Sequence, residues 1–200
     1  MTNSFNISDL GFDDMVFSDV SSHEPHVKKA LVRDIKLKLL SIDFNSISVD
    51  DSRFRSLDKN YLYELNMLTD VGVSCGSLSL HLYGLLDRNP GDIDLLVDKS
   101  SEFVIEHLNN NRQSINRYVT ANSSFCNNVD GFVPVAQFKR NGILIDMFHD
   151  IKVNYKAYKN IKIQNPIDVL YKKFDIFLSV NRDKDYDDLV NISRNLDRFH

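Results

Sequence analysis

The chain has 200 residues, of which 42% are hydrophobic, enough for one well-packed domain with a small accessory lobe. Its net charge of −4 and isoelectric point near 5.8 argue against a broad basic surface for non-specific binding of duplex DNA. Two cysteines give neither a disulfide framework nor a cysteine-rich zinc site. No apolar window approaches the roughly 18 residues of a transmembrane helix, so we expect a soluble, cytoplasmic protein with no membrane partner.

The N-terminal part divides into an acidic arm and a basic helix. Residues 1–24 contain no Lys or Arg, which predicts an arm that is disordered or docked on a partner. Pro25 then opens a predicted helix that runs to about residue 42. Its apolar positions recur every four residues, at Val27, Leu31, Ile35 and Leu39. Its other faces carry the cations Lys28, Lys29, Arg33, Lys36 and Lys38.

Short elements follow in alternation. The pattern predicts a helix over 57–68, a strand over 71–75, a helix opened by Gly76-Ser77 and a strand over 92–97. Ser100 or Ser101 caps a predicted helix that ends near the asparagine run at 109–111. Strands are expected at 116–121, 132–139 and 143–148, the last two joined by a turn. A short strand at 161–163, a helix over 166–180 and a helix from about 183 complete the chain.

This order of elements predicts an α/β (α+β) fold with a mixed sheet and helices covering one side. Residues 1–55 form the arm and the amphipathic basic helix. Residues 56–165 form the core, and residues 166–200 form C-terminal helices packed on that core.

Three carboxylates are the strongest candidates for chemistry. Asp92 and Asp94 lie about 6.5–7 Å apart on one face of a strand, whereas Ile93 fills the other face. Like charges this close to a sheet raise each other's pKa and need a cation or solvent beside them. Asp146, in a separate strand-like run, adds the oxygen ligands that Mg²⁺ or Mn²⁺ prefers. The alternative is an Asp-x-Asp pattern exposed at a strand edge.

A possible phosphate site precedes the acids. Gly76 permits a tight turn, and the hydroxyl of Ser77 can donate to a phosphate oxygen at the positive end of a helix. An ordinary capping serine is the alternative. Arg88, on the loop before the acids, can bridge a phosphate or stand exposed in solvent. We interpret the acids at 183–188 as the solvated, charged start of a helix, where negative charge interacts favourably with the helix dipole.

These segments resemble a known superfamily. Gly76-Ser77, Asp92-Ile93-Asp94 and Ile145-Asp146 are similar in order and spacing to the nucleotidyltransferases that include DNA polymerase β, CCA-adding enzymes and aminoglycoside nucleotidyltransferases. Residues 80–96 look most like the minimal bacterial and phage branch, which includes transferases of toxin–antitoxin systems. The C-terminal sequences Asp-Val-Leu-Tyr-Lys-Lys-Phe at 168–174 and Arg-Asp-Lys-Asp-Tyr-Asp-Asp-Leu at 182–189 resemble the tail of that branch.

The resemblance implies a nucleotidyltransferase-type sheet and Mg²⁺-dependent transfer of a nucleoside monophosphate from an NTP to a hydroxyl acceptor. It also implies the role of each candidate residue. The metal ligands would be Asp92, Asp94 and Asp146, of which Asp146 helps to deprotonate the acceptor, and the nucleotide-binding residues would be Gly76, Ser77 and Lys173. Either Lys172 or Lys173 can instead extend along the surface beside the helix.

The pattern also departs from that superfamily. Leu78 is large where a small residue is usual, and no second basic residue closely follows Ser77, so metal binding is better supported than tight triphosphate binding.

Three functions are therefore carried forward. The first is transfer to an RNA end, such as that of tRNA, with the basic helix beside the RNA backbone. The second is nucleotidylation of a partner protein on Tyr or Ser, as in toxin–antitoxin systems. The third is a binding module that keeps the fold and the acids but has lost turnover.

Overall fold

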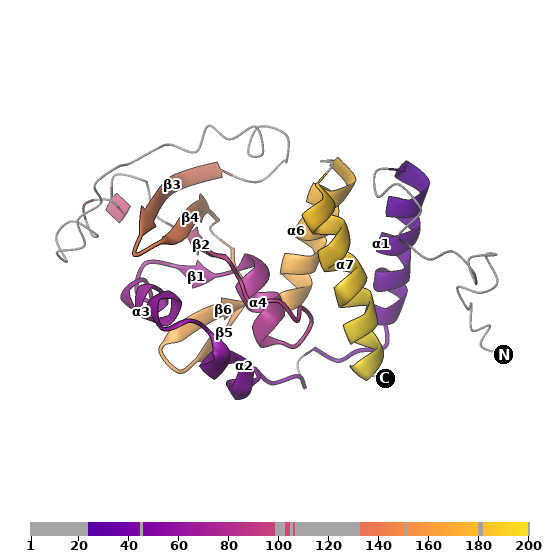
Figure 1. Ribbon diagram of the computed structural model, residues 1–200, viewed down its shortest axis with the longest axis horizontal. Coiled ribbons are helices and arrows are strands. Elements are labelled where there is room, and N and C mark those ends of the chain that lie inside the picture. The colour runs from indigo at the N-terminus through magenta and orange to yellow at the C-terminus, as the bar shows by residue number, and fades with distance from the viewer. Residues whose placement is uncertain are drawn as a thin grey trace.

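The computed structural model describes residues 24–44, 46–98, 103–104, 106, 133–150, 152–179 and 182–199. The N-terminal arm, the capping serines of the helix expected after residue 100 and the strand expected at 116–121 lie outside these ranges. The described segments form six α-helices and one six-stranded mixed sheet (Figure 1). The predicted mixed α/β fold is confirmed. No helix in these segments is both long and apolar enough to cross a membrane.

The sheet has the strand order β3-β4-β2-β1-β6-β5. Strands β2 and β4 are parallel, as are β1 and β6, whereas β1–β2, β3–β4 and β5–β6 are antiparallel. The parallel β2–β4 pair lies near the centre and joins segments that are about 50 residues apart in the chain. The bounds are β1 Val73–Ser74, β2 Asp92–Val97, β3 Val133–Arg140, β4 Ile143–His149, β5 Tyr155–Tyr158 and β6 Ile161–Gln164.

Three helices pack together beside the sheet: α1, α6 and α7 lie side by side in Figure 1 and contact one another. The short helix α4 contacts both β2 and α6, so it connects the sheet to this helical layer. The bounds are α1 Pro25–Leu39, α2 Asp51–Ser56, α3 Lys59–Met67, α4 Gly76–Leu82, α6 Pro166–Ser179 and α7 Asp183–Leu196.

The two faces of the central strands differ in polarity. Ile93, Leu95 and Ile145 are almost completely buried in the main hydrophobic core. The opposite face of the same strands carries the acids Asp92, Asp94 and Asp146. Period-two alternation along β2 and β4 therefore separates the core from the candidate site.

Two cations of the basic helix have partners within the protein, and the expectation that Lys28 lies away from the buried face is wrong. Lys28 is only 4% exposed, its Nζ donates to the carbonyl oxygen of Phe177 at 2.8 Å, and it lies over the Phe177 ring. Lys38 forms ion pairs with Asp34 and Asp197. The reason is that α6 and α7 both pack against α1: α6 provides the oxygen partner of Lys28, and Ser193 of α7 accepts a hydrogen bond from Lys38.

The helix expected over 57–68 begins later than predicted. Asp58 is the N-cap of α3 and accepts hydrogen bonds from the backbone N–H groups of Asn60 and Tyr61. A separate helix, α2, precedes it and is capped by Asp50. Strand β5 was not predicted because its half-exposed side chains alternate only weakly, and the turn after it contains Lys159 at a φ of 53° where a glycine is usual.

Candidate active site

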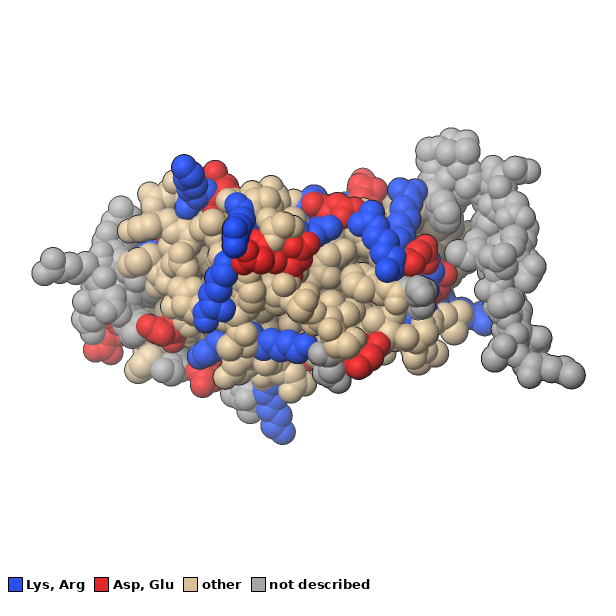
Figure 2. All heavy atoms as spheres, turned by 90° about the horizontal axis from the view of Figure 1, so that it is seen from below, with Lys and Arg blue, Asp and Glu red and all other residues tan. Residues whose placement is uncertain are grey.

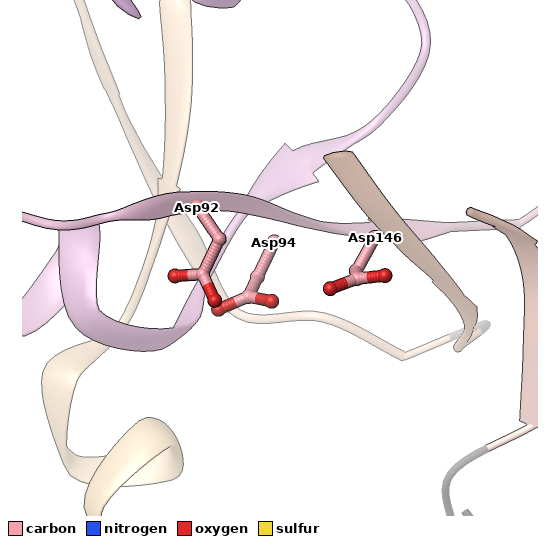
Figure 3. A group of neighbouring side chains, drawn as sticks. All are labelled: Asp92, Asp94 and Asp146. Atoms are coloured by element: carbon pink, nitrogen blue, oxygen red, sulfur yellow. The ribbon is translucent and has the colours of Figure 1, made fainter. Parts of the chain in front are cut away.

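The three predicted carboxylates lie together. In the parallel pairing of β2 with β4, Asp94 stands directly opposite Asp146, and Asp92 lies two residues earlier on the same face. One carboxylate oxygen from each residue lies within 4.8 Å of the other two. Figure 3 shows all three side chains pointing away from the same side of the sheet. Each is partly buried, so the arrangement is not an Asp-x-Asp pattern fully exposed at a strand edge.

The electrostatics of this cluster are unfavourable without a cation. Burial, followed by the charges of Asp92 and Asp146, raises the pKa of Asp94 to about 7. Burial also raises the pKa of Asp146, and this is opposed by Gln137, whose Nε2 donates to Asp146 Oδ1 at 2.5 Å. A divalent ion bound between these oxygens would relieve the repulsion. Gln137 was not predicted as a site residue. It lies on β3 directly opposite Asp146 of β4, and this pairing brings its side chain to the acid cluster.

Gly76 is required by the acid site as well as by the turn. Its φ is +61°, and a Cβ added at this position would lie 2.0 Å from Asp94 Oδ2. The backbone around it is also tied to β2, because the N–H of Cys75 donates to the carbonyl oxygen of Asp94 at 3.0 Å. The absence of a side chain therefore leaves room for the carboxylate, which is a role beyond the predicted phosphate turn.

Ser77 is not the N-cap of α4, since Cys75 holds that position. The Ser77 side chain lines the same cavity as the acids, and its buried Oγ has no hydrogen-bond partner among the described residues. A buried hydroxyl without a partner is unfavourable by about 1–3 kcal/mol, which a ligand oxygen would remove. Leu78 beside it is 1% exposed and belongs to the core, which explains the large residue at that position.

The cavity has a volume of about 290 Å³ and brings the acids close to several cations. Acids from β2 and β4 form one part of its wall, and the loop before β2 together with α6 and the start of α7 forms another. The cations that line it are Arg88, Lys172, Lys173, Arg182 and Lys184.

Two predicted phosphate-binding cations are already paired with buried acids. Arg88 donates from Nε and Nη2 to the two carboxylate oxygens of Asp188, at 2.6 and 2.7 Å. Lys173 lies between Asp185 and Asp188, with its Nζ 3.2 and 2.9 Å from their oxygens. Both residues line the cavity, and both are held in place by ion pairs.

The predicted solvated start of the last helix is wrong for Asp185 and Asp188, which are 0% and 3% exposed. Burial acts to raise the pKa of Asp188, but hydrogen bonds from Arg88 and the charge of Lys173 outweigh it, and the net shift is downward. The pKa of Asp185 is likewise lowered, because Arg182 and Lys173 outweigh its burial. Lys184 differs from these cations, since it is exposed and forms no ion pair with any residue the structure describes.

Comparisons with protein-family models, with curated proteins and with solved structures found no match for this chain. The resemblance to nucleotidyltransferases therefore stays a prediction that rests on the residues themselves.

The raised pKa of Asp94 predicts a pH-dependent loss of stability in metal-free protein. Between pH 3.8 and about 7 the folded state holds a proton on Asp94 that the unfolded state has lost, so the unfolding free energy falls as pH rises. Asp94→Asn should reduce this fall between pH 5 and 7 by on the order of 2 kcal/mol, measured by urea denaturation. Asp175→Asn, at an exposed site on α6, should leave it unchanged. Identical pH profiles for parent and Asp94→Asn would contradict this electrostatic account.

A comparison of alanine variants at two glycines distinguishes the effect of backbone strain from the effect of a side chain that would clash with Asp94. Gly76 and Gly142 both have positive φ, but nothing lies within 4 Å of a Cβ added at Gly142. We expect Gly76→Ala and Gly142→Ala each to lower the unfolding free energy by about 1–2 kcal/mol through the backbone. Only Gly76→Ala should also weaken Mn²⁺ binding, by tenfold or more in calorimetric titrations. Equal Mn²⁺ affinities in the two variants would refute the role assigned to Gly76.

Proposed function

We propose that this protein is a metal-dependent nucleotidyltransferase, which moves a nucleoside monophosphate from an NTP to a hydroxyl acceptor. The observation that carries the proposal is the convergence of Asp92, Asp94 and Asp146 at a cavity that several cations also line. The same cavity holds the buried Ser77 hydroxyl, which has no hydrogen-bond partner among the described residues. Carboxylates suit Mg²⁺ or Mn²⁺, and cations with hydroxyl donors suit phosphate. Few chemistries need both in one cavity.

The acids divide the work by position. In the proposed reaction Asp92, Asp94 and Asp146 would hold the divalent cation, and Asp146 would also help to accept the proton of the acceptor hydroxyl. The hydroxyl oxygen bonds to the α-phosphorus, the bond from that phosphorus to the bridging oxygen breaks, and pyrophosphate leaves. The bound ions would neutralise charge on the phosphate oxygens.

We expect the phosphate contacts to come from cavity residues that form no ion pair or side-chain hydrogen bond with the part of the chain that the structure describes. The Ser77 hydroxyl and the Lys184 ammonium group are both available at the cavity. Arg88 and Lys173 form ion pairs with Asp188, and Lys173 also pairs with Asp185. We therefore assign these two cations mainly to fixing α6, α7 and the loop before β2 relative to one another.

The acceptor that we propose first is an RNA end, such as that of tRNA. The exposed cations Lys29, Arg33 and Lys36 on α1 support it, although Lys28 and Lys38 no longer contribute. On the face drawn in Figure 2, Lys and Arg side chains form short runs with Asp and Glu side chains beside them, so no single basic area covers the whole face. Any contact there with an RNA backbone would therefore be local.

Labelling with α-³²P NTPs tests the proposal. The purified protein is incubated with each NTP, Mg²⁺ or Mn²⁺, and total RNA or cell lysate. We expect metal-dependent transfer that Asp146→Asn lowers by about 10²-fold or more. Asp98→Asn is the matched control, because Asp98 is an exposed acid just beyond β2 and away from the cavity.

The nature of the label separates the acceptors. Ribonuclease-sensitive label supports RNA, and ribonuclease-resistant label on a polypeptide identifies a partner protein instead. Binding of metal and NTP without any transfer would leave the non-catalytic binding module. If neither metal nor NTP binds, the proposed function is wrong.

A further inference from the structure

A second surface feature lies between α1 and α6, apart from the acid site. It is a groove with a volume of about 420 Å³ whose floor includes the buried Val32. Four large hydrophobic side chains line it and remain between 43% and 83% exposed: Leu37, Leu40, Tyr171 and Leu178. Single exposed apolar side chains are common on protein surfaces. A group of four around one groove is instead typical of a surface that binds a partner or another segment of the chain.

The rim of the groove is basic. Lys29, Arg33 and Lys36 line it along α1. Lys36 lies 5.5 Å from the centre of the Tyr171 ring, whereas neither Lys29 nor Arg33 forms an ion pair with any residue the structure describes. The surface therefore fits a ligand that is apolar and negatively charged.

The chain itself contains such a segment. Residues 9–20 hold Asp9, Asp13, Asp14 and Asp19 without any Lys or Arg. Apolar residues are interleaved with these acids: Leu10, Phe12, Met15, Val16, Phe17 and Val20. Composition and charge in this segment thus complement those of the groove.

Connectivity favours this segment over a separate molecule. The chain enters α1 at Pro25, and the groove extends along that helix from Lys29 to Leu40, about 16 Å at 1.5 Å per residue. The residues before Pro25 are long enough to turn back and cover this distance. Attachment to the same chain also gives the segment a high effective concentration at the groove.

We propose that residues 9–20 dock in the groove between α1 and α6 of the same chain, with their apolar side chains on the exposed leucines and their carboxylates near Lys29 and Arg33. This proposal does not depend on the reaction proposed for the acid site, but the docked segment would compete with an RNA acceptor for Lys29 and Arg33.

Because the sequence contains no tryptophan, a single introduced tryptophan can report whether the groove is covered. Tyr171→Trp places an indole in the groove of the full-length protein, and Tyr63→Trp places one at a site of similar exposure on α3 as the matched control. We expect acrylamide to quench the indole of Tyr171→Trp several-fold less than that of Tyr63→Trp. Circular dichroism and melting temperature check that each variant is folded.

Charge variants identify the occupant. Replacing Asp9, Asp13, Asp14 and Asp19 by Asn should raise quenching of the Tyr171→Trp indole to the control value. Lys29→Glu with Arg33→Glu should do the same, and adding Asp13→Lys with Asp14→Lys should restore protection. Equal quenching of the two reporters in the parent background would overturn the proposal, as would protection that survives neutralisation of the four Asp residues. Protection that is lost on dilution, with a dimer seen by sedimentation, would identify a second copy as the occupant and also overturn it.

Discussion

Repulsion among Asp92, Asp94 and Asp146 is the constraint on which the candidate site depends. The parallel pairing of β2 with β4 forces Asp94 and Asp146 to face each other, and alternation along β2 adds Asp92 to the same face. The surrounding structure accommodates these charges, with Gly76 leaving room for one carboxylate and Gln137 donating to another. Burial, together with the charges of Asp92 and Asp146, still raises the pKa of Asp94 to about 7.

A second group of acids in the same region shows how the protein treats carboxylates that need no ligand. Asp185 and Asp188 are more deeply buried than the three acids of the sheet, yet their pKa values are lowered because Arg88, Lys173 and Arg182 contact them directly. Their charges are matched within the protein, and their ion pairs join α6 and α7 to the loop before β2. The contrast explains why we assign a metal to the sheet acids and a structural role to the helix acids.

Local sequence patterns predicted many of the helices and strands. Strand β2 was predicted at its observed bounds because apolar residues alternate with acids, and the two strands joined by the turn at Asn141-Gly142 were predicted to within a residue. The convergence of Asp146 with Asp92 and Asp94 was predicted from the strand-like run around Asp146 together with the resemblance to nucleotidyltransferases. The long-range pairs could not be derived in this way. Asp188 joins Arg88 across 100 residues, and Lys28 donates to Phe177 across 149, so nothing near either residue in sequence indicates that it is buried.

The central claim is that the three sheet acids form one divalent-cation site. Mn²⁺ binding followed by electron paramagnetic resonance tests it most directly, with the parent protein compared with Asp92→Asn/Asp94→Asn and with Asp98→Asn. The account predicts saturable binding in the parent and in Asp98→Asn, and a loss of at least tenfold in affinity in the double variant. Unchanged Mn²⁺ affinity in the double variant would contradict it.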